Sequence, residues 1–492
     1  MGKQLKILFL SPEAVPFAKT GGLGDVAGSL PPALRRLGVD VRLVLPLYAM
    51  VRKSGADMRL IGEDLKVPLG SSRLTARIWE SQTAQNTPLY LIEREDLFDR
   101  PNLYGNSSGD YYDNLERFSF FCHGALRLAE ELSFCPDLVH CHDWQSGLVP
   151  PLIKGPYRHS ACVGKAKTMF TIHNLGYQGI FPPEKLGLTG LSPEGYFRMD
   201  GLEFWGKISL LKAGLVYSDM ITTVSPTYAQ EIQTDSYGLG MEGILQQRRS
   251  ALFGILNGVD YGVWDPEHDA HLPARYSLKR MAGKRKCKEA LIREMALNPA
   301  LETRPLLGVI SRLDAQKGID LLVEALPQIL ALDVGVVILG SGDESIQEAL
   351  RKTVRNNPGR VGLTVGFDEP LAHRIMGGAD LFLIPSRYEP CGLTQMYALR
   401  YGTVPVVRAT GGLDDTIVSF HKKTGDGTGF KFTAYQPQAL LSAIAGAADL
   451  FGDVKLWKKL RTNGMEADFS WDRSARSYLD LYRSAVETGQ IG

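Results

Sequence analysis

The sequence lacks long apolar runs, an excess of charge of either sign, and a regular spacing of cysteines. No stretch approaches the ~20 consecutive apolar residues of a membrane-spanning helix, and the apolar run Ile7–Leu10 is too short for a secretory signal peptide. Lysine and arginine number 55 against 54 aspartates and glutamates, a net charge of +1. The chain therefore has no bulk field to attract nucleic acid or an anionic membrane, and we expect a cytoplasmic protein without such partners.

The six cysteines are scattered and include no C-x-x-C pair. In a chain of this length, that pattern predicts free thiols in a reducing compartment and not a disulfide framework. A D-x-D triplet is also missing. Its absence disfavours a site in which paired aspartates hold a metal ion against a diphosphate, and favours charge neutralisation by cationic side chains and a helix N-terminus.

Short aliphatic runs alternate with helix-length segments along the 492 residues. Continuous apolar runs are typical of strands buried on both faces of a parallel sheet, and the alternation predicts βαβ units. The series occurs twice, separated by the turn-rich segment Ile255–Pro266. We therefore predict an α/β protein of two doubly wound, Rossmann-like domains, residues 1–254 and 255–469. The basic stretch His268–Lys288 is predicted as a solvated helix face.

Eleven strands are expected from these runs. In doubly wound sheets, ligands bind outside the carboxyl ends of the strands, so two such domains facing each other would place a ligand between them. The predicted strands are Leu5–Leu10, Val41–Leu45, Leu89–Ile92, Leu138–Cys141, Thr168–Ile172, Met220–Val224, Leu306–Ile310, Val334–Leu339, Val361–Val365, Leu381–Ile384 and Val404–Val407.

A glycine-rich turn, Lys19–Val26 (KTGGLGDV), follows the first predicted strand and precedes a helix-like segment. Glycines let backbone N–H groups approach an anion, and a helix N-terminus attracts negative charge. Lys19 adds a cation, and Asp25 adds an acceptor for a sugar hydroxyl. The spacing is neither G-x-G-x-x-G nor a Walker loop, so a purely structural turn is the alternative.

The segment His140–Trp144 (HCHDW) ends another predicted strand. Alternate residues of a strand share a face, so His140 and His142 are expected to point together. Two converging ligands are fewer than the three or four that zinc requires. A polar pocket that includes Asp143 is therefore favoured over a metal site.

His173 and Asn174 follow the next predicted strand. A lone histidine is more often structural, but its place at the carboxyl end of a parallel strand makes His173 a candidate functional residue.

In the second half, the segment Ser311–Gly318 (SRLDAQKG) directly follows a predicted strand. Arg312 offers a planar fork for two oxygens and Lys317 offers a point charge. Together they predict a clamp for a diphosphate, with two solvated surface cations as the alternative.

The segment Pro385–Gln395 (PSRYEPCGLTQ) brings a carboxylate, Glu389, to a strand end and then starts a helix. Backbone N–H groups at Gly392–Thr394 would point at an anion, and Glu389 would bind sugar hydroxyls. A nucleophilic Cys391 is the rival interpretation, but no nearby histidine supplies a base. Two anion turns, two cations and polar strand ends together suit a nucleotide-sugar whose diphosphate is the leaving group.

These motifs resemble the bacterial glycogen synthase and plant starch synthase family. The resemblance covers nearly the whole chain in the right order. It rests on KTGGLGDV (19–26), HCHDW (140–144), His173-Asn174, NGVD (257–260), SRLDAQKG (311–318), HRIMGGAD (373–380), EPCGLTQ (389–395) and TGGL (410–413).

The resemblance implies the GT-B fold, with two doubly wound domains, a deep cleft and a C-terminal helix, at about residues 470–492, that crosses back to the first domain. It implies transfer of α-D-glucose from ADP-glucose to the non-reducing end of glycogen or another α-1,4-glucan, with retention of configuration and release of ADP. No metal or organic cofactor is implied. The sequence indicates no oligomeric state.

The resemblance also implies roles for single residues. His173 would bond a glucose hydroxyl beside the anomeric centre, Arg312 and Lys317 would hold the diphosphate, and Glu389 would support the glucosyl unit. Phe367 occupies a position that stacks on adenine, and Tyr397 stands where the wider superfamily often has a second glutamate. The implied substrate-binding residues are Lys19, Gly22, Asp25, Asp143, Asn174, Asn257, Ser311, Phe367, Cys391, Gly392, Leu393 and Thr394.

Two other function classes compete with this interpretation. One is a non-catalytic polysaccharide-binding protein that keeps the fold, and the other is a GT-B phosphorylase, which would need a pyridoxal cofactor. A dehydrogenase would need the glycine fingerprint that the chain lacks.

Overall fold

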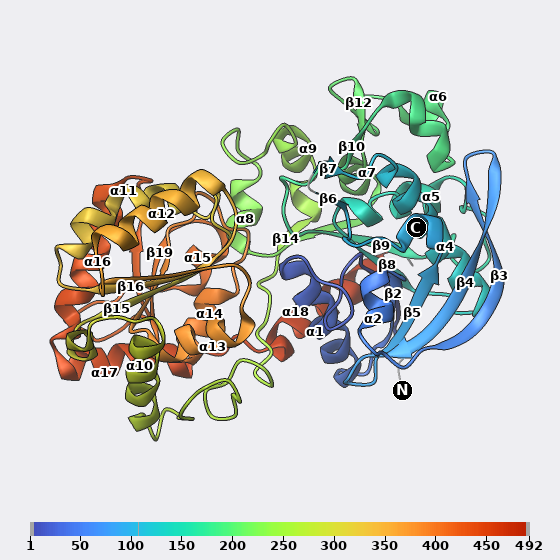
Figure 1. Cartoon of the computed structure of the whole chain (residues 1–492). Helices are drawn as coiled ribbons and strands as arrows, with labels where there is room; N and C mark the ends of the chain where they lie inside the picture. The colour runs from blue at the N-terminus through green and yellow to red at the C-terminus, as the bar shows by residue number, and fades with distance from the viewer. Residues whose placement is uncertain (1–3, 107, 489–492) are drawn as a thin grey trace. The chain divides into compact units, whose positions relative to one another are not determined.

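The computed structural model describes residues 4–106 and 108–488, and the chain forms two compact units (Figure 1). Unit 1 comprises Met1–Val224, Ala229–Gly258 and Trp471–Gly492, and unit 2 comprises Ser225–Tyr228 and Val259–Ser470. The sequence-based division ends the first domain at residue 254 and returns to it at about residue 470.

Unit 1 is built on a nine-stranded sheet. Seven neighbouring strands of this sheet are parallel, and the last two strands at one edge are antiparallel. Each predicted strand of this half is present, because continuous apolar runs such as Leu138–Cys141 are buried on both faces. In spatial order the strands are β14 (Leu252–Gly254), β13 (Met220–Thr223), β9 (Lys167–Ile172), β8 (Leu138–His142), β1 (Lys6–Leu10), β2 (Asp40–Pro46), β5 (Pro88–Glu93), β4 (Ser72–Gln82) and β3 (Arg59–Leu69).

Helices cover this sheet. One face of α4 carries apolar residues at helical spacing, such as Leu115, Phe118 and Cys122, and these residues are buried. The C-terminal helix α18 belongs to unit 1, where it packs on α1. The helices of unit 1 are α1 (Gly22–Arg36), α2 (Ala49–Lys53), α3 (Glu95–Phe98), α4 (Asn114–Glu131), α5 (Val149–Lys154), α6 (Pro193–Tyr196), α7 (Leu210–Tyr217), α9 (Glu242–Gln247) and α18 (Trp471–Thr488), and α8 (Pro226–Glu231) begins in unit 2.

Short strands also occur outside the main sheet of unit 1. They are β6 (Gly105–Asn106) with β7 (Gly109–Asp110), and β10 (Ile180–Phe181), β11 (Glu203–Phe204) and β12 (Lys207–Ser209).

Unit 2 is a six-stranded parallel sheet with helices on both faces. One apolar cluster joins the sheet to α11 and α16, and another joins it to α10 and α13. In spatial order the strands are β17 (Val361–Val365), β16 (Gly335–Gly340), β15 (Leu306–Ile310), β18 (Leu381–Ile384), β19 (Val404–Arg408) and β20 (Phe430–Phe432). The helices are α10 (Ala282–Glu294), α11 (Ile319–Leu330), α12 (Glu344–Asn356), α13 (Glu369–Gly378), α14 (Thr394–Arg400), α15 (Gly411–Thr416), α16 (Pro437–Phe451) and α17 (Val454–Glu466).

The predicted solvated helix face in the stretch 268–288 is wrong for two of its lysines. The helix α10 begins only at Ala282, and Lys284 and Lys288 are buried. Lys288 forms an ion pair with Asp380 at 2.7 Å, and Lys284 donates to the Thr403 hydroxyl at 2.7 Å. Burial lowers the pKa of Lys284 to about 7. These two lysines are paired internal groups and not part of a solvent-facing charge run.

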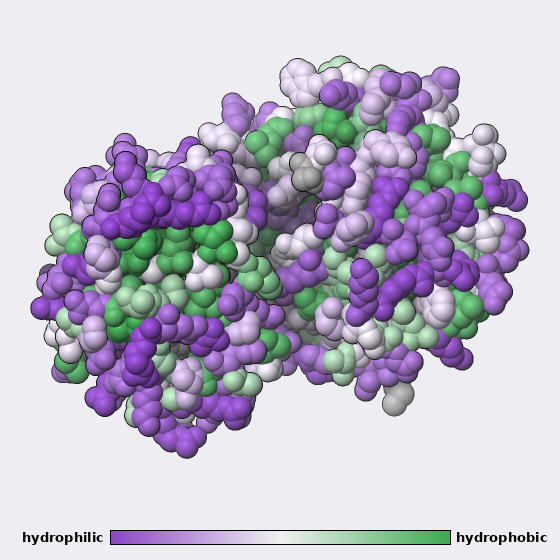
Figure 2. Space-filling model, viewed as in Figure 1, coloured by the Kyte–Doolittle hydropathy of each residue, from purple (hydrophilic) through white to green (hydrophobic). Residues whose placement is uncertain are grey.

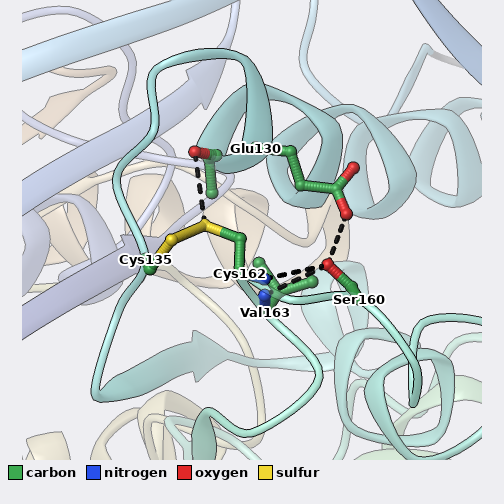
Figure 3. The surroundings of a disulfide bond; sticks show 6 residues. Glu130, Cys135, Ser160, Cys162 and Val163 are labelled. Carbon is green, nitrogen blue, oxygen red and sulfur yellow. Dashed lines mark hydrogen bonds between the residues drawn. A yellow bond between two sulfur atoms is a disulfide. The ribbon is translucent and has the colours of Figure 1, made fainter.

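The prediction of six free thiols is wrong for Cys135 and Cys162, which form a disulfide (Figure 3). The two residues precede β8 and β9, and because these strands are parallel neighbours their amino ends meet. The Cα atoms lie 4.5 Å apart although 27 positions separate the residues. Ser160 holds the second cysteine's turn against α4 by donating to Glu130. The other four cysteines are buried and are not part of a disulfide.

The visible surface of both units is mostly hydrophilic (Figure 2). Among the described residues, no helix is long and apolar enough to cross a membrane.

Candidate active site

In unit 1, the strand order changes direction between β1 and β8. The chain leaves β1 toward β2 on one side, whereas β8 and β9 lie on the other side. The crevice outside the carboxyl ends at such a switch point is where doubly wound sheets bind ligands. The glycine-rich turn follows β1, and the HCHDW segment ends β8, so two predicted motifs lie at the switch point of unit 1.

Glu13 organises the glycine-rich turn. Its buried carboxylate accepts hydrogen bonds from the Thr20 backbone N–H at 2.7 Å, the Gly21 N–H at 3.2 Å and the Tyr104 hydroxyl at 2.7 Å. The Thr20 hydroxyl donates to it as well. Four donors on one carboxylate fix the backbone just before α1 begins at Gly22. Sequence reasoning missed Glu13 and Tyr104, because nothing in a lone acid or tyrosine marks it as a partner of this turn.

Lys19 and Asp25 pair with each other at 2.7 Å, and the lysine side chain is 46% exposed. The exposed ion pair lies at the first turn of α1, whose cap Gly21 has no capping side chain. A solvated pair of this kind is weak, so Lys19 can exchange its partner for the phosphate of a ligand at little cost.

Three histidines line the ends of β8 and β9. His140 and His142 share a face, as predicted, with ring centroids 4.1 Å apart. His142 Nδ1 lies 2.9 Å from His173 Nε2. His140 Nδ1 contacts the Tyr482 hydroxyl of α18 at 2.7 Å, so the C-terminal helix supports this cluster.

The pKa values of the three histidines are lowered by burial, for His173 to about 3. His173 is therefore a neutral imidazole near pH 7, suited to hydrogen bonding with a sugar hydroxyl and not to carrying a positive charge.

Asp143 stands in an unusual conformation, with φ 54° and ψ −178°. Residues other than glycine rarely occupy this region, and such strain is concentrated at functional sites. Its carboxylate accepts the His173 backbone N–H at 2.7 Å, which ties the end of β8 to the end of β9. Burial, with the Glu13 carboxylate adding to it, raises the pKa of Asp143 to about 7, against hydrogen bonds that lower it.

The two asparagines differ. Asn174 Oδ1 accepts the Gly176 N–H at 2.9 Å and so shapes the loop after His173. Asn257 is buried, and its Oδ1 has no hydrogen-bond partner in the described part of the chain. A buried acceptor without a partner is costly, so Asn257 is available to a ligand donor.

In unit 2, the strand order reverses between β15 and β18. The turn Ser311–Gly318 follows β15, and the segment that contains Glu389 follows β18, so the predicted motifs again occupy a switch point. Gly318 has φ 71°, and a Cβ there would lie 2.0 Å from the Pro385 carbonyl oxygen. Only glycine lets these two turns approach so closely.

Lys317 and Glu389 join the two turns by an ion pair of 2.7 Å, with side chains 21% and 8% exposed. The Ser386 hydroxyl donates to the same carboxylate oxygen at 3.0 Å. Arg312 is 52% exposed and pairs with Asp314 at 2.8 Å, and Ser311 donates to the Arg312 carbonyl. The structure thus brings Lys317 to Glu389, whereas Arg312 contacts Asp314 and is exposed to solvent.

The segment after Glu389 forms a close packed turn before α14. Gly392 has φ 69°, Cys391 is buried, and α14 begins at Thr394 without a capping side chain at Leu393. Gly411 allows a second close approach, because a Cβ there would lie 2.1 Å from the Glu389 carbonyl oxygen.

Phe367 follows β17 and is 90% exposed. An aromatic ring with that exposure is free to stack on a planar ligand.

Each unit thus presents polar groups suited to an anionic sugar derivative at a switch point.

Two family models match the chain: "Starch synthase catalytic domain" over residues 6–247 and "Glycosyl transferases group 1" over residues 293–464. Glycogen synthase of Syntrophotalea carbinolica is 46% identical over 98% of this chain and 99% of its own, and that of Anaeromyxobacter sp. is 47% identical over the same shares. The chain belongs to the glycogen and starch synthase family.

Solved structures agree with the family. The catalytic domain of starch synthase IV from Arabidopsis thaliana, bound to ADP and acarbose, matches with a TM-score of 0.91 and 35% identity over 99% of this chain and 100% of its own. A sucrose-phosphate synthase from Thermosynechococcus elongatus shares the fold, with a TM-score of 0.61 and 18% identity. The predicted GT-B fold is confirmed, as is the resemblance to the glycogen and starch synthase family.

The residue roles that the family resemblance implies stay predictions. Within the described residues, no group of three or more histidines, cysteines, aspartates or glutamates could hold a metal ion.

Proposed function

We propose that this member of the glycogen and starch synthase family transfers α-D-glucose from ADP-glucose to the non-reducing end of glycogen or another α-1,4-glucan, with retention of configuration. The observation that carries the proposal is the likeness over the full chain to a starch synthase whose structure holds ADP and acarbose. The glycogen synthases at 46–47% identity support the same acceptor class. The proposed reaction uses no metal or organic cofactor.

In the proposed mechanism, unit 2 handles the leaving group. Lys317 gives up part of its ion pair with Glu389 to a diphosphate oxygen, and Arg312 adds a second cation. Both charges oppose the negative charge that develops as the bond between the anomeric carbon and the phosphate oxygen breaks. Glu389, held by Ser386 and Lys317, then accepts hydrogen bonds from glucose hydroxyls, and Phe367 stacks on the adenine.

In the same proposal, unit 1 orients the glucosyl group. Neutral His173 bonds a glucose hydroxyl, and Asp143 fixes the backbone that carries it. The acceptor hydroxyl oxygen forms the new bond on the face that the phosphate leaves, and its proton passes to the departing phosphate oxygen. ADP is the product, and the anomeric configuration is retained.

A donor screen tests the proposal. With glycogen as acceptor, ADP-glucose should lengthen the glucan and release ADP, whereas UDP-glucose should react much more slowly. Reaction with UDP-glucose but not with ADP-glucose would refute the donor assignment. Binding of glucan without turnover of any donor would instead favour a non-catalytic polysaccharide-binding protein.

A further inference from the structure

A basic hollow of about 410 Å³ lies on unit 2, and its lining includes none of the residues assigned to the donor. Two segments form it: the loop 422–425 and α17 from Lys455 to Thr462. Five lysines line it, namely Lys422, Lys423, Lys455, Lys458 and Lys459. Because the whole chain carries a net charge of only +1, this is a strong local excess of positive charge.

Little of this charge is neutralised. Lys422 pairs with the exposed Asp449 at 2.6 Å, and within residues 4–106 and 108–488 the other four lysines form no ion pair. Asp453 stands nearby in sequence, but its Oδ1 caps α17 by accepting the N–H groups of Lys455 and Leu456. The hollow is therefore open to an anion from solution.

The placement of the lysines on α17 is unfavourable for the helix itself. Lys455, Lys458 and Lys459 occur at i, i+3 and i+4, so their like charges share one face and repel. Lys455 also lies in the first turn of α17, where the helix dipole is positive and disfavours cations. A bound anion would reduce both repulsions. Residues that are unfavourable for their own helix are expected mainly at functional sites, such as a ligand-binding site.

The facing wall of the hollow is fixed. Asn463 of α17 donates to the carbonyl oxygens of Gly425 and Gly427 at 2.8 and 2.9 Å. A Cβ at Gly427 would lie 2.5 Å from Phe420 Cα, so the loop packs tightly behind its lysines. The loop and the helix therefore hold a defined distance from each other, as a binding site requires.

We propose that this hollow binds a small ligand that carries two or more phosphate groups. Lysine ammonium groups are point charges that bind phosphate oxygens well. A hollow of about 410 Å³ falls in the size range of small-molecule sites, and an extended polyanion would need a longer basic track. The ligand would be additional to the nucleotide-sugar, and the site goes beyond the proposed transferase reaction.

Amine acylation of the wild-type protein, read residue by residue by mass spectrometry, tests the proposal with inorganic pyrophosphate as the probe. Pyrophosphate should protect the five lysines in a saturable way. Exposed Lys286 and Lys352, on other helices of unit 2, should react as before. This measurement distinguishes binding in the hollow from binding at the turn Ser311–Gly318, where pyrophosphate would protect Lys317.

Matched variants complete the test. In the double variant Lys458→Gln/Lys459→Gln, protection of the other three lysines of the hollow should require a pyrophosphate concentration at least about tenfold higher. The control double variant Lys286→Gln/Lys352→Gln should be protected at the same concentration as wild type. Three outcomes would overturn the proposal: equal protection of all exposed lysines, no protection in the hollow, or protection by heparin but not by pyrophosphate. Because the substituted lysines are exposed, we expect both variants to fold.

Discussion

At the scale of single residues, the ion pair Lys317–Glu389 is central to the proposed binding of the diphosphate. Replacing Lys317 by alanine removes a charge-assisted contact to the proposed diphosphate and leaves the buried Glu389 carboxylate with only Ser386. Such a contact is worth ~1.5–3 kcal/mol, so kcat/KM for ADP-glucose should fall by about 10- to 100-fold. Steady-state kinetics measure this. The control Lys352→Ala changes an exposed lysine of α12, and near-normal kinetics in Lys317→Ala would remove the clamp assignment.

Asp143 should give the protein a distinctive dependence of stability on pH. Its pKa is raised in the folded protein to about 7 from an ordinary value of 3.8, so the folded state binds its proton more tightly than the unfolded state. The protonated Asp143 carboxyl therefore stabilises the folded state, by roughly 4 kcal/mol at most. This stabilisation is complete below about pH 4 and is lost as pH rises through about 7. Asp143→Asn removes it and keeps an oxygen for the His173 N–H.

The measurement for Asp143 is the melting temperature of wild type and Asp143→Asn across this pH range. The variant should gain stability relative to wild type as pH rises from about 4 to about 7. A difference that stays constant with pH would show that the Asp143 carboxyl is not protonated by burial.

Glu13 should act as a positioning residue for the glycine-rich turn. Glu13→Gln replaces a charged acceptor by a neutral amide, so the hydrogen bonds from the Thr20 and Gly21 N–H groups weaken and the two hydroxyls must turn to accept from the amide. We expect kcat/KM to fall by about tenfold, with a smaller change in melting temperature. Glu63→Gln, at an exposed strand position, is the matched control. If Glu13→Gln kept full activity, the turn would not depend on this carboxylate.

At the scale of elements, the Cys135–Cys162 disulfide closes a loop that holds the amino ends of β8 and β9. A loop of 27 residues should contribute roughly 2–4 kcal/mol to the free energy of unfolding. Thiol titration of the denatured, unreduced protein should find four free thiols of six. Cys135→Ser/Cys162→Ser should melt at a lower temperature than wild type, whereas Cys287→Ser keeps the disulfide. Six titratable thiols in the wild type would contradict the pairing.

The elements show which features the sequence could predict. Parallel strands such as β8 and β16 are buried on both faces, so an unbroken apolar run reveals them. The hairpin β3–β4 was not predicted, because its strands alternate buried and exposed residues and include Gly62, Glu63 and Asp64. Both strands therefore lack the continuous apolar run on which the prediction depended.

Local motifs predicted which segments lie at the switch points, but not which other residues contact them. Turn motifs identified the segments at both switch points, because glycine and charged residues cluster there in sequence. Glu13, the buried Lys288–Asp380 pair and the Cys135–Cys162 disulfide were missed, since each joins residues that are brought together only by folding.

At the scale of the whole molecule, the proposed reaction assigns binding of the diphosphate to unit 2 and binding of the glucosyl group to unit 1. The near-zero net charge is consistent with an uncharged glucan acceptor, because neither steering nor repulsion is needed. The cytoplasmic location and the absence of a cofactor stay predictions.

The most direct test of this account is ADP release measured with each substrate omitted in turn. We expect rapid ADP release only when ADP-glucose and glycogen are both present, with glycogen gaining one glucose for each ADP formed. ADP release without glucan growth, or no ADP release from the complete mixture, would contradict it.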